Sequence, residues 1–230
     1  TALVRPLDVR ERVVWREMPL MLLVTLALYP LAWDGVLSRG DGVLLLFALV
    51  AYLIFVFYSV EDEAPEILGE YEEFMKESDR TTSLVSGTDV LWVIAGSVCL
   101  VLGGICIVEG AVEIASSLGI SEVVIGLTVV AVGTSLPELA TSLVAALRSE
   151  ADIAVGNVIG SNIFNVAAIL GTASVVSPLA IPSHVLTREL VVVVAMSLLL
   201  FPILRTRWRI RRWEGALLLA CYVGAVTWLL

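Results

Sequence analysis

Residues 133–138 read Gly133-Thr134-Ser135-Leu136-Pro137-Glu138, and they follow an apolar run that begins at Val123. Pro137 has no N–H and its ring clashes with the preceding turn, so a helix through this stretch must break and leave the carbonyl of Gly133 without its helical partner. Such a carbonyl cannot stay unpaired in lipid, but it can face a cation. Glu138 follows at once, and a carboxylate near mid-span costs ~2.5–3.5 kcal/mol on insertion scales. We therefore expect the break and Glu138 to serve a function.

The rest of the chain is apolar enough to require a membrane. Hydrophobic residues make up 59% of its 230 residues, whereas soluble proteins contain roughly 45–50%. Seven segments have the length and composition expected of membrane spans, namely 17–33, 42–58, 89–109, 122–147, 152–176, 187–204 and 213–230. The sequence thus predicts an all-α transmembrane protein with about seven helices, and the fourth of them contains the break.

Lys and Arg are divided unevenly between the two sides that these spans create. Of the 14 basic residues, all but Arg39 and Arg188 fall in connections on one side. The positive-inside rule therefore places the N-terminus of this chain in the cytoplasm and its C-terminus outside. The net charge of −9 is concentrated in 59–87, where nine acidic residues accompany only Lys76 and Arg80. We expect this stretch to be an acidic cytoplasmic linker.

Composition and motifs also exclude some classes of protein. A basic patch typical of a nucleic-acid-binding protein is absent. The sequence shows no nucleophile–base pair, phosphate-binding loop or histidine-containing metal cluster, so we do not expect an enzyme.

Two segments 172 residues apart resemble each other. Their matching pairs are Pro6-Leu7 with Pro178-Leu179, Arg16-Glu17 with Arg188-Glu189, Pro30 with Pro202 and, after one inserted residue, Asp41-Gly42 with Glu214-Gly215. Five predicted spans lie between Pro6 and Pro178, and because five is odd the two copies cross the membrane in opposite directions. This is the inverted-repeat plan of many secondary transporters.

The repeat predicts how the chain is organised. The second copy follows the block 88–176, whereas only a few residues precede the first copy. We therefore expect 1–58 to be the last two helices of a first repeat, 59–87 to be the linker, and 88–230 to be a complete second repeat of five helices. On this interpretation about 85 residues, forming some three spans, precede residue 1 in the complete protein. A natural form with seven helices is the alternative.

A second polar segment lies in the next span and reads Gly156-Asn157-Val158-Ile159-Gly160-Ser161-Asn162-Ile163-Phe164-Asn165. Asn157, Ser161 and Asn165 recur every four residues and share a helical face, as Thr134, Glu138 and Ser142 do in the preceding span. Gly156 and Gly160 form a small-xxx-small pair, which would let the two spans approach closely. A Gly pair often serves packing alone, and Asn and Ser often only join helices. Together with Glu138, however, these oxygens suit a hard cation such as Ca²⁺, Na⁺ or Mg²⁺.

Segments 133–138 and 156–165 resemble the second alpha repeat of the cation/calcium exchanger superfamily, especially of prokaryotic sodium/calcium exchangers, and the resemblance covers essentially the whole chain. It implies ten helices in two inverted halves, with the first alpha repeat missing here, and a place in the prokaryotic plasma membrane. It also implies that Glu138 binds Ca²⁺ and Na⁺. The candidate metal ligands are Glu138, Thr134, Ser135, Ser161 and Asn165, to which we add Asn157 from the same polar stripe.

These observations predict a secondary antiporter that exchanges Ca²⁺ for Na⁺ by alternating access and needs no cofactor. Ca²⁺ prefers about six to eight oxygen ligands, and Glu138 alone would leave positive charge uncompensated in a low dielectric. We therefore expect the missing repeat to supply a second carboxylate, and this chain to insert without transporting by itself. Some members of the superfamily have Asp at the position of Asn165, so Na⁺ or H⁺ coupling stays open. A passive cation channel and a non-transporting membrane subunit are also compatible with the sequence.

Overall fold

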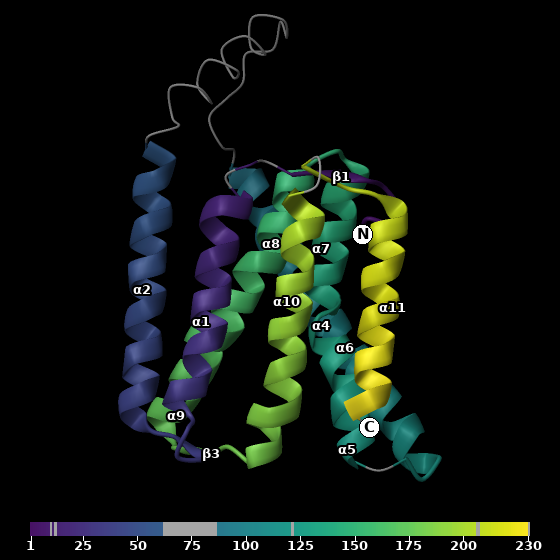
Figure 1. The fold of residues 1–230 in the computed structure, drawn as a ribbon. Coiled ribbons are helices and arrows are strands. Elements are labelled where there is room, and N and C mark those ends of the chain that lie inside the picture. The colour runs from purple at the N-terminus through teal and green to yellow at the C-terminus, as the bar shows by residue number, and fades with distance from the viewer. Residues whose placement is uncertain (10, 12, 62–86, 121, 206–207, 230) are drawn as a thin grey trace, which may run out of the picture.

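The computed structural model describes residues 1–9, 11, 13–61, 87–120, 122–205 and 208–229 (Figure 1). The α-helices are α1 (Met18–Leu31), α2 (Arg39–Glu61), α4 (Gly87–Ser117), α5 (Glu122–Ile125), α6 (Ala131–Thr134), α7 (Leu136–Leu147), α8 (Ala151–Phe164), α9 (Gly171–Val176), α10 (Leu190–Arg205) and α11 (Arg212–Leu229). Short π-helices at Val13–Glu17, Gly126–Val130, Asn165–Leu170 and Val185–Glu189 extend or join them. The strands are β1 (Leu7–Asp8), β2 (Val36–Leu37), β3 (Leu179–Ala180) and β4 (Arg209–Ile210).

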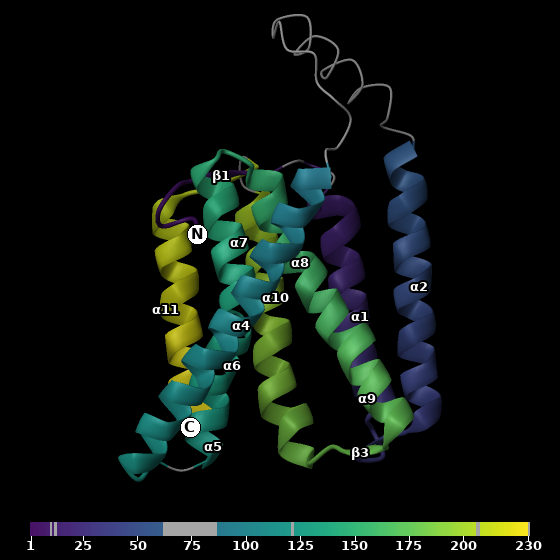
Figure 2. The same cartoon turned by 180° about the vertical axis from the view of Figure 1, so that it is seen from behind.

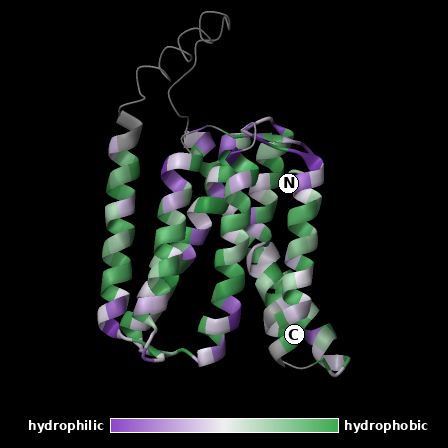
Figure 3. Ribbon diagram, in the orientation of Figure 1, coloured by the Kyte–Doolittle hydropathy of each residue, from purple (hydrophilic) through white to green (hydrophobic). Residues whose placement is uncertain are grey.

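Helices form in all seven segments that the sequence predicts as spans. Within the described residues, five helices are long and apolar enough to cross a membrane, and the bent pair made by α6 and α7 raises the number to six. The seventh segment forms α11, which has Arg212 and Glu214 in its first turn and lies outside that set. The third helix is longer than predicted, because α4 continues to Ser117. Figure 3 shows hydrophobic residues along most of the length of the helices. The prediction of an all-α transmembrane fold is thus confirmed.

Two short antiparallel ribbons connect the two copies of the repeat. β1 pairs with β4, so that Leu7 lies opposite Ile210. β2 pairs with β3, so that Leu37 lies opposite Leu179. Each ribbon therefore takes one strand from each copy, and Figure 1 places β1 and β3 at opposite ends of the bundle. The offset of 172 residues takes β1 onto β3, and with the one inserted residue it takes β2 onto β4. The two ribbons are therefore equivalent positions of the inverted repeat.

The backbone around each ribbon repeats in detail. The π-helix Val13–Glu17 precedes α1 and its counterpart Val185–Glu189 precedes α10. Val9 N donates a hydrogen bond of 2.7 Å to Trp208 O, and Ile181 N donates one of 2.7 Å to Gly35 O. Gly35 and Trp208 also share a positive φ, of 82° and 55°. Two copies with the same backbone conformation therefore run in opposite directions, and the inverted-repeat fold is confirmed.

The helices that follow the ribbons are capped in the same way. Asp41 Oδ2 accepts a hydrogen bond of 2.8 Å from Ser38 N at the start of α2. Glu214 Oε2 accepts one of 2.6 Å from Arg211 N at the start of α11. Each carboxylate satisfies a backbone donor at a helix N-terminus, where negative charge is also favourable.

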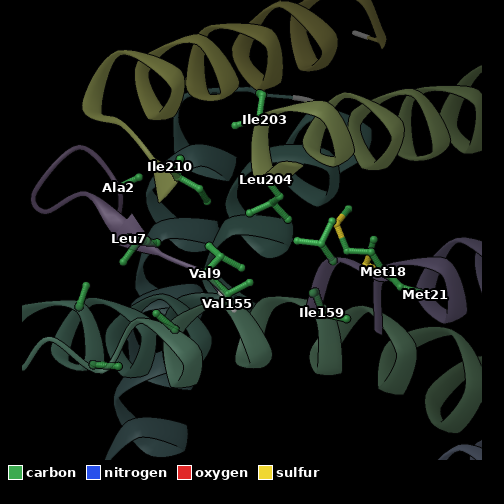
Figure 4. Close-up of a cluster of buried hydrophobic side chains, with 14 of the residues drawn as sticks. Ala2, Leu7, Val9, Met18, Met21, Val155, Ile159, Ile203, Leu204 and Ile210 are labelled. Carbon is green, nitrogen blue, oxygen red and sulfur yellow. The ribbon is translucent and has the colours of Figure 1, made fainter. Parts of the chain in front are cut away.

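A buried cluster at one end of the bundle holds α8 in place (Figure 4). It brings together Met18 and Met21 of α1, Val155 and Ile159 of α8, and Leu204 of α10. Ile159 and Leu204 are fully buried. Inside a bilayer such contacts stabilise through close van der Waals packing, since lipid is as apolar as the side chains. The cluster fixes α8, the helix that carries Asn157 and Ser161 and leads into Asn165.

Helices α2 and α9 approach closely at Gly42. A Cβ atom at this position would lie 2.6 Å from Gly171 O and 2.9 Å from Val175 Cγ2. The counterpart Gly215 meets the chain at Ala2, where a Cβ would lie 3.0 Å from Ala2 Cβ. Glycine is thus required at Gly42 by the distance between the two helices.

We expect Gly42→Ala to destabilise the protein by about 1–3 kcal/mol, because α9 must move away from α2 to admit the methyl group. Gly40→Ala is the matched control in the same helix, since its Cβ would meet nothing nearer than Ser38 Oγ at 3.6 Å. Alanine favours helix there, so the control should be neutral or stabilising. Thermal unfolding in detergent measures both variants, and equal midpoints would contradict the close approach.

Candidate cation site

The fourth predicted span is broken where the sequence indicated. α6 ends at Thr134 and α7 begins at Leu136, and the two helical segments are bent by 49°. Ser135 lies between them with φ −93° and ψ 3°. Pro137 falls in the first turn of α7, where its missing N–H is tolerated. In Figure 1 the break lies between the levels of β1 and β3.

The break changes which side chains share a face. Thr134 belongs to α6, whereas Glu138 and Ser142 both belong to α7. The expected stripe through Thr134, Glu138 and Ser142 is therefore divided between two helices. Ser142 is buried, with 2% of its surface exposed, and its Oγ lies 3.4 Å from Ala154 O of α8.

Helix α4 covers one side of the break at very short range, and the view from behind shows it running obliquely past α6 and α7 (Figure 2). A Cβ on Gly133 would collide with Val108 Cγ2. A Cβ on Gly104 would lie 3.7 Å from Gly133 O and 3.9 Å from the ring of Pro137. A cavity of about 560 Å³ remains between the helices, and its lining is Val101, Gly104, Ile105, Val108 and Glu109 of α4 with Gly133, Thr134, Pro137 and Glu138. Thr134 and Glu138 thus face one space although they belong to different helices.

Glu138 is the acidic group at the break. It is half-buried, and its Oε2 is fully buried without a hydrogen-bond partner among the described residues. It lies in the first turn of α7, where the helix dipole favours negative charge. A buried oxygen without a donor is costly, and a bound cation would remove that cost. The described residues hold no group of three His, Cys, Asp or Glu side chains able to bind a metal, so neutral oxygens would have to complete the coordination.

Asn157 of α8 lies against the same turn of α7. Its Nδ2 donates hydrogen bonds of 3.0 Å to Glu138 O and 2.9 Å to Ser142 Oγ. The expected approach of the two spans is confirmed, but the expected reason for it is wrong. A Cβ on Gly156 or Gly160 would meet nothing within 4 Å, so these glycines do not form the contact between α7 and α8.

The remaining candidate ligands lie on the surface around the break or further along α8. Ser135 is exposed at the break itself. Ser161 is half-buried, and its Oγ donates a hydrogen bond of 3.1 Å to Val158 O of its own helix. Asn165 is exposed at the start of the π-helix Asn165–Leu170. Glu138 thus shares the cavity with Thr134 and meets Asn157 through its backbone carbonyl, whereas Ser161 and Asn165 follow Asn157 along the chain.

Two features of the site were not predicted. One is the pair of π-helices, Gly126–Val130 just before α6 and Asn165–Leu170 just after α8. Segments of this kind are frequent at functional sites, but they have no sequence signature. The other is the contribution of α4 through Gly104 and Val108. The glycine at Gly104 was the available signal, since it permits close approach of a helix.

Comparison with known proteins identifies the family. Residues 88–230 match the family described as sodium/calcium exchanger protein. The putative antiporter CaxA of Alkalimonas amylolytica is 38% identical over 229 residues, which cover 97% of this chain and 70% of that protein. The chain belongs to the sodium/calcium exchanger family. Its relatives are transporters, so it is not an enzyme.

Other relatives agree with this assignment. The inner membrane protein YrbG of Escherichia coli K12 is 36% identical over 201 residues, covering 86% of this chain and 61% of YrbG. Among solved structures, the sodium/calcium exchanger of Methanococcus jannaschii superposes with a TM-score of 0.74 at 32% identity, covering 98% of this chain and 68% of that one. The exchanger family, the apolar helices and the fold together show a multi-pass membrane protein and a cation antiporter.

We expect Gly133→Ala to loosen the contact between α4 and the break, because the new methyl group must displace Val108. Overpacking of about 1–3 kcal/mol would speed local amide exchange by about five- to hundredfold. Hydrogen–deuterium exchange of peptides from α4 and from 130–140 measures this change. Gly126→Ala is the matched control in the same span, since its Cβ would enter open space. Equal protection in both variants would contradict the packing described.

Proposed function

We propose that the protein exchanges Ca²⁺ for Na⁺ across the membrane by alternating access, with the cation bound at Glu138. The observation that carries the proposal is the Glu138 carboxylate at a helix break, with Oε2 buried and unpaired among the described residues. In a member of the sodium/calcium exchanger family, such an oxygen is best explained as a ligand of the transported cation. Hard cations are bound by carboxylate, hydroxyl, amide and carbonyl oxygens, which this region supplies.

The proposed ligands come from the break and from the helical segment that follows α7. Thr134 lines the same cavity as Glu138, and Ser135 connects the two helices. Ser161 of α8 and Asn165 at the start of the following π-helix extend the oxygen-bearing stripe. Asn157 lies on that stripe too, but its amide nitrogen already donates to Glu138 O and Ser142 Oγ.

The charge of the ion requires more than these groups. A divalent cation beside one carboxylate would leave positive charge uncompensated in a medium of low dielectric. No three His, Cys, Asp or Glu side chains cluster as a metal site among the described residues, although Glu109 of α4 lines the same cavity as Glu138. We propose that a second carboxylate from outside these residues completes the site, as the inverted repeat would supply by symmetry.

Coupling follows from competition for one carboxylate. Ca²⁺ and Na⁺ are both hard cations that prefer oxygen, so occupancy of Glu138 by one excludes the other.

Access would alternate as the long apolar helices move past the fixed break. The name of one relative, the sodium/calcium exchanger MaX1 of Methanosarcina acetivorans, which is 42% identical over 80 residues, supports Na⁺ as the second ion. That match covers 35% of this chain and 23% of MaX1.

The asymmetry of basic residues supports an orientation in the plasma membrane. The N-terminus of this chain lies in the cytoplasm and the C-terminus outside in this proposal. Figure 1 places the two termini at opposite ends of the bundle, which the orientation requires. The acidic linker expected at 59–87 lies almost entirely outside the described residues.

We expect Glu138→Gln to abolish Na⁺-gradient-driven uptake of radioactive Ca²⁺ by proteoliposomes that contain the full-length protein. The amide keeps the size of the side chain and removes the charge that attracts the cation. Glu113→Gln is the matched control, since Glu113 is exposed on α4 and does not line the cavity. Undiminished uptake by the Glu138 variant would defeat the proposed function.

We expect Ca²⁺ uptake to stop when choline replaces internal Na⁺, because an antiporter moves Ca²⁺ only against a counter-ion. A passive channel would continue to conduct Ca²⁺ under these conditions. Uptake that persists in choline but follows an imposed pH gradient would instead assign H⁺ as the counter-ion. The same vesicles therefore separate Na⁺ exchange, H⁺ exchange and passive conduction.

A further inference from the structure

The contact between Asn157 and the broken span has a feature that a cation ligand does not need. Asn157 Nδ2 donates to the backbone carbonyl of Glu138 at 3.0 Å and to Ser142 Oγ at 2.9 Å. Ser142 Oγ lies 3.4 Å from Ala154 O, an acceptor on α8. The chain of bonds therefore starts on α8, crosses to α7 at two points and returns to α8.

The partners determine which end of the amide faces α7. Asn oxygen and nitrogen are assigned from the hydrogen-bond network, and the Glu138 carbonyl can only accept a hydrogen bond. The group that faces it must be NH₂. The Ser142 hydroxyl is directed at Ala154 O and is thus available as an acceptor for the second amide hydrogen. Both hydrogens of Nδ2 are used, and the amide points a donor, not a ligand oxygen, at the turn that carries Glu138.

The position of this contact makes it important for the carboxylate. Glu138 lies in the first turn of α7, three residues after Ser135, where the helix has just broken. The N–H groups of a first turn have no acceptor within their own helix, so contacts with neighbouring helices help to fix the backbone of this turn. Asn157 binds the backbone carbonyl of Glu138, the residue whose carboxylate is the proposed anionic ligand. Ser142, Ala145, Ala146 and Ala154 are buried around this interface, which keeps water from replacing the bonds.

We propose that Asn157 is a positioning residue: it clamps the Glu138 turn of α7 to α8, so that the carboxylate keeps its orientation as cations enter and leave. The proposal rests on the proposed function, since it assigns Asn157 a role in binding through Glu138. A loose turn would let the carboxylate adopt several orientations, and the cation would have to select one of them. The cost would appear in the Ca²⁺ concentration for half-maximal uptake rather than in the maximal rate.

Asn157→Asp separates this role from direct ligation. Aspartate keeps an oxygen ligand and adds negative charge, so a ligand role predicts Ca²⁺ affinity that is unchanged or higher. The same substitution removes both N–H donors and sets a carboxylate against Glu138 O, so the clamp predicts weaker binding. Loss of one buried hydrogen bond corresponds to about a tenfold rise in half-maximal Ca²⁺ concentration.

The experiment measures Na⁺-driven Ca²⁺ uptake against Ca²⁺ concentration for the full-length protein in proteoliposomes. Asn157→Asp and Ser142→Ala should both raise the half-maximal concentration and largely preserve the maximal rate per folded molecule. Asn162→Asp is the matched control, because Asn162 Nδ2 donates to Val158 O within α8 and is exposed. It should behave as the wild type.

The outcomes distinguish the two proposals. If Glu138→Gln still transports Ca²⁺, the proposed function fails whatever Asn157 does. If Glu138→Gln is inactive while Asn157→Asp binds Ca²⁺ as well as or better than the wild type, only the positioning role is overturned. A fall in maximal rate with an unchanged half-maximal concentration would also overturn it, since that result marks a purely structural residue. Should Asn157→Asp fail to fold, Ser142→Ala decides by the same criterion.

Discussion

A carboxylate oxygen buried in a membrane protein, with no hydrogen-bond donor among the described residues, is the constraint on which the rest of this structure depends. Placing an ionised group at the centre of a bilayer costs ~2.5–3.5 kcal/mol even on permissive insertion scales. The chain then leaves Glu138 Oε2 buried and unpaired among the described residues. The helix break offsets part of the cost, because it turns the N-terminus of α7 toward the carboxylate. The cation that we propose at Glu138 would offset the remainder.

The surrounding helices keep the break in one geometry. α4 approaches so closely at Gly133 that a methyl group there would collide with Val108. On the other side α8 is anchored by the buried cluster around Ile159 and Leu204. The two ribbons join the ends of the copies, each with one strand from each copy. In the proposed mechanism, movement of one set of helices past the other would expose the site to either side without rebuilding the ligands.

Much of this arrangement could be predicted from particular residues. Pro137 next to Glu138 predicted a broken span, because proline cannot complete a helical turn. The paired residues Pro6 and Pro178, with the odd number of spans between them, predicted the inverted copies. These signals are local or repeated, so a single sequence is enough to reveal them. Two statements stay predictions: that further spans precede this chain in the complete protein, and that 59–87 is the linker between the two repeats.

Other features depend on which helix packs against a given residue, and a single sequence does not reveal that. Gly156 and Gly160 showed that one helix face carries small residues, but not whether another helix packs against that face. Asn157 was recognised as a polar residue on the correct face, whereas the direction of its amide depends on the acceptors that α7 presents. The π-helix that begins at Asn165 packs against α2, a partner far from it in the sequence. In each case the residue was identified and its contact was not.

The most direct test is an anomalous difference map from crystals of the full-length protein soaked in Ca²⁺. We predict a peak at about 2.3–2.6 Å from a carboxylate oxygen of Glu138, beside the break between α6 and α7, that disappears in Glu138→Gln crystals. Calcium bound only at sites remote from Glu138, or at an unchanged position in the variant, would contradict the claim that this buried carboxylate exists to hold a cation.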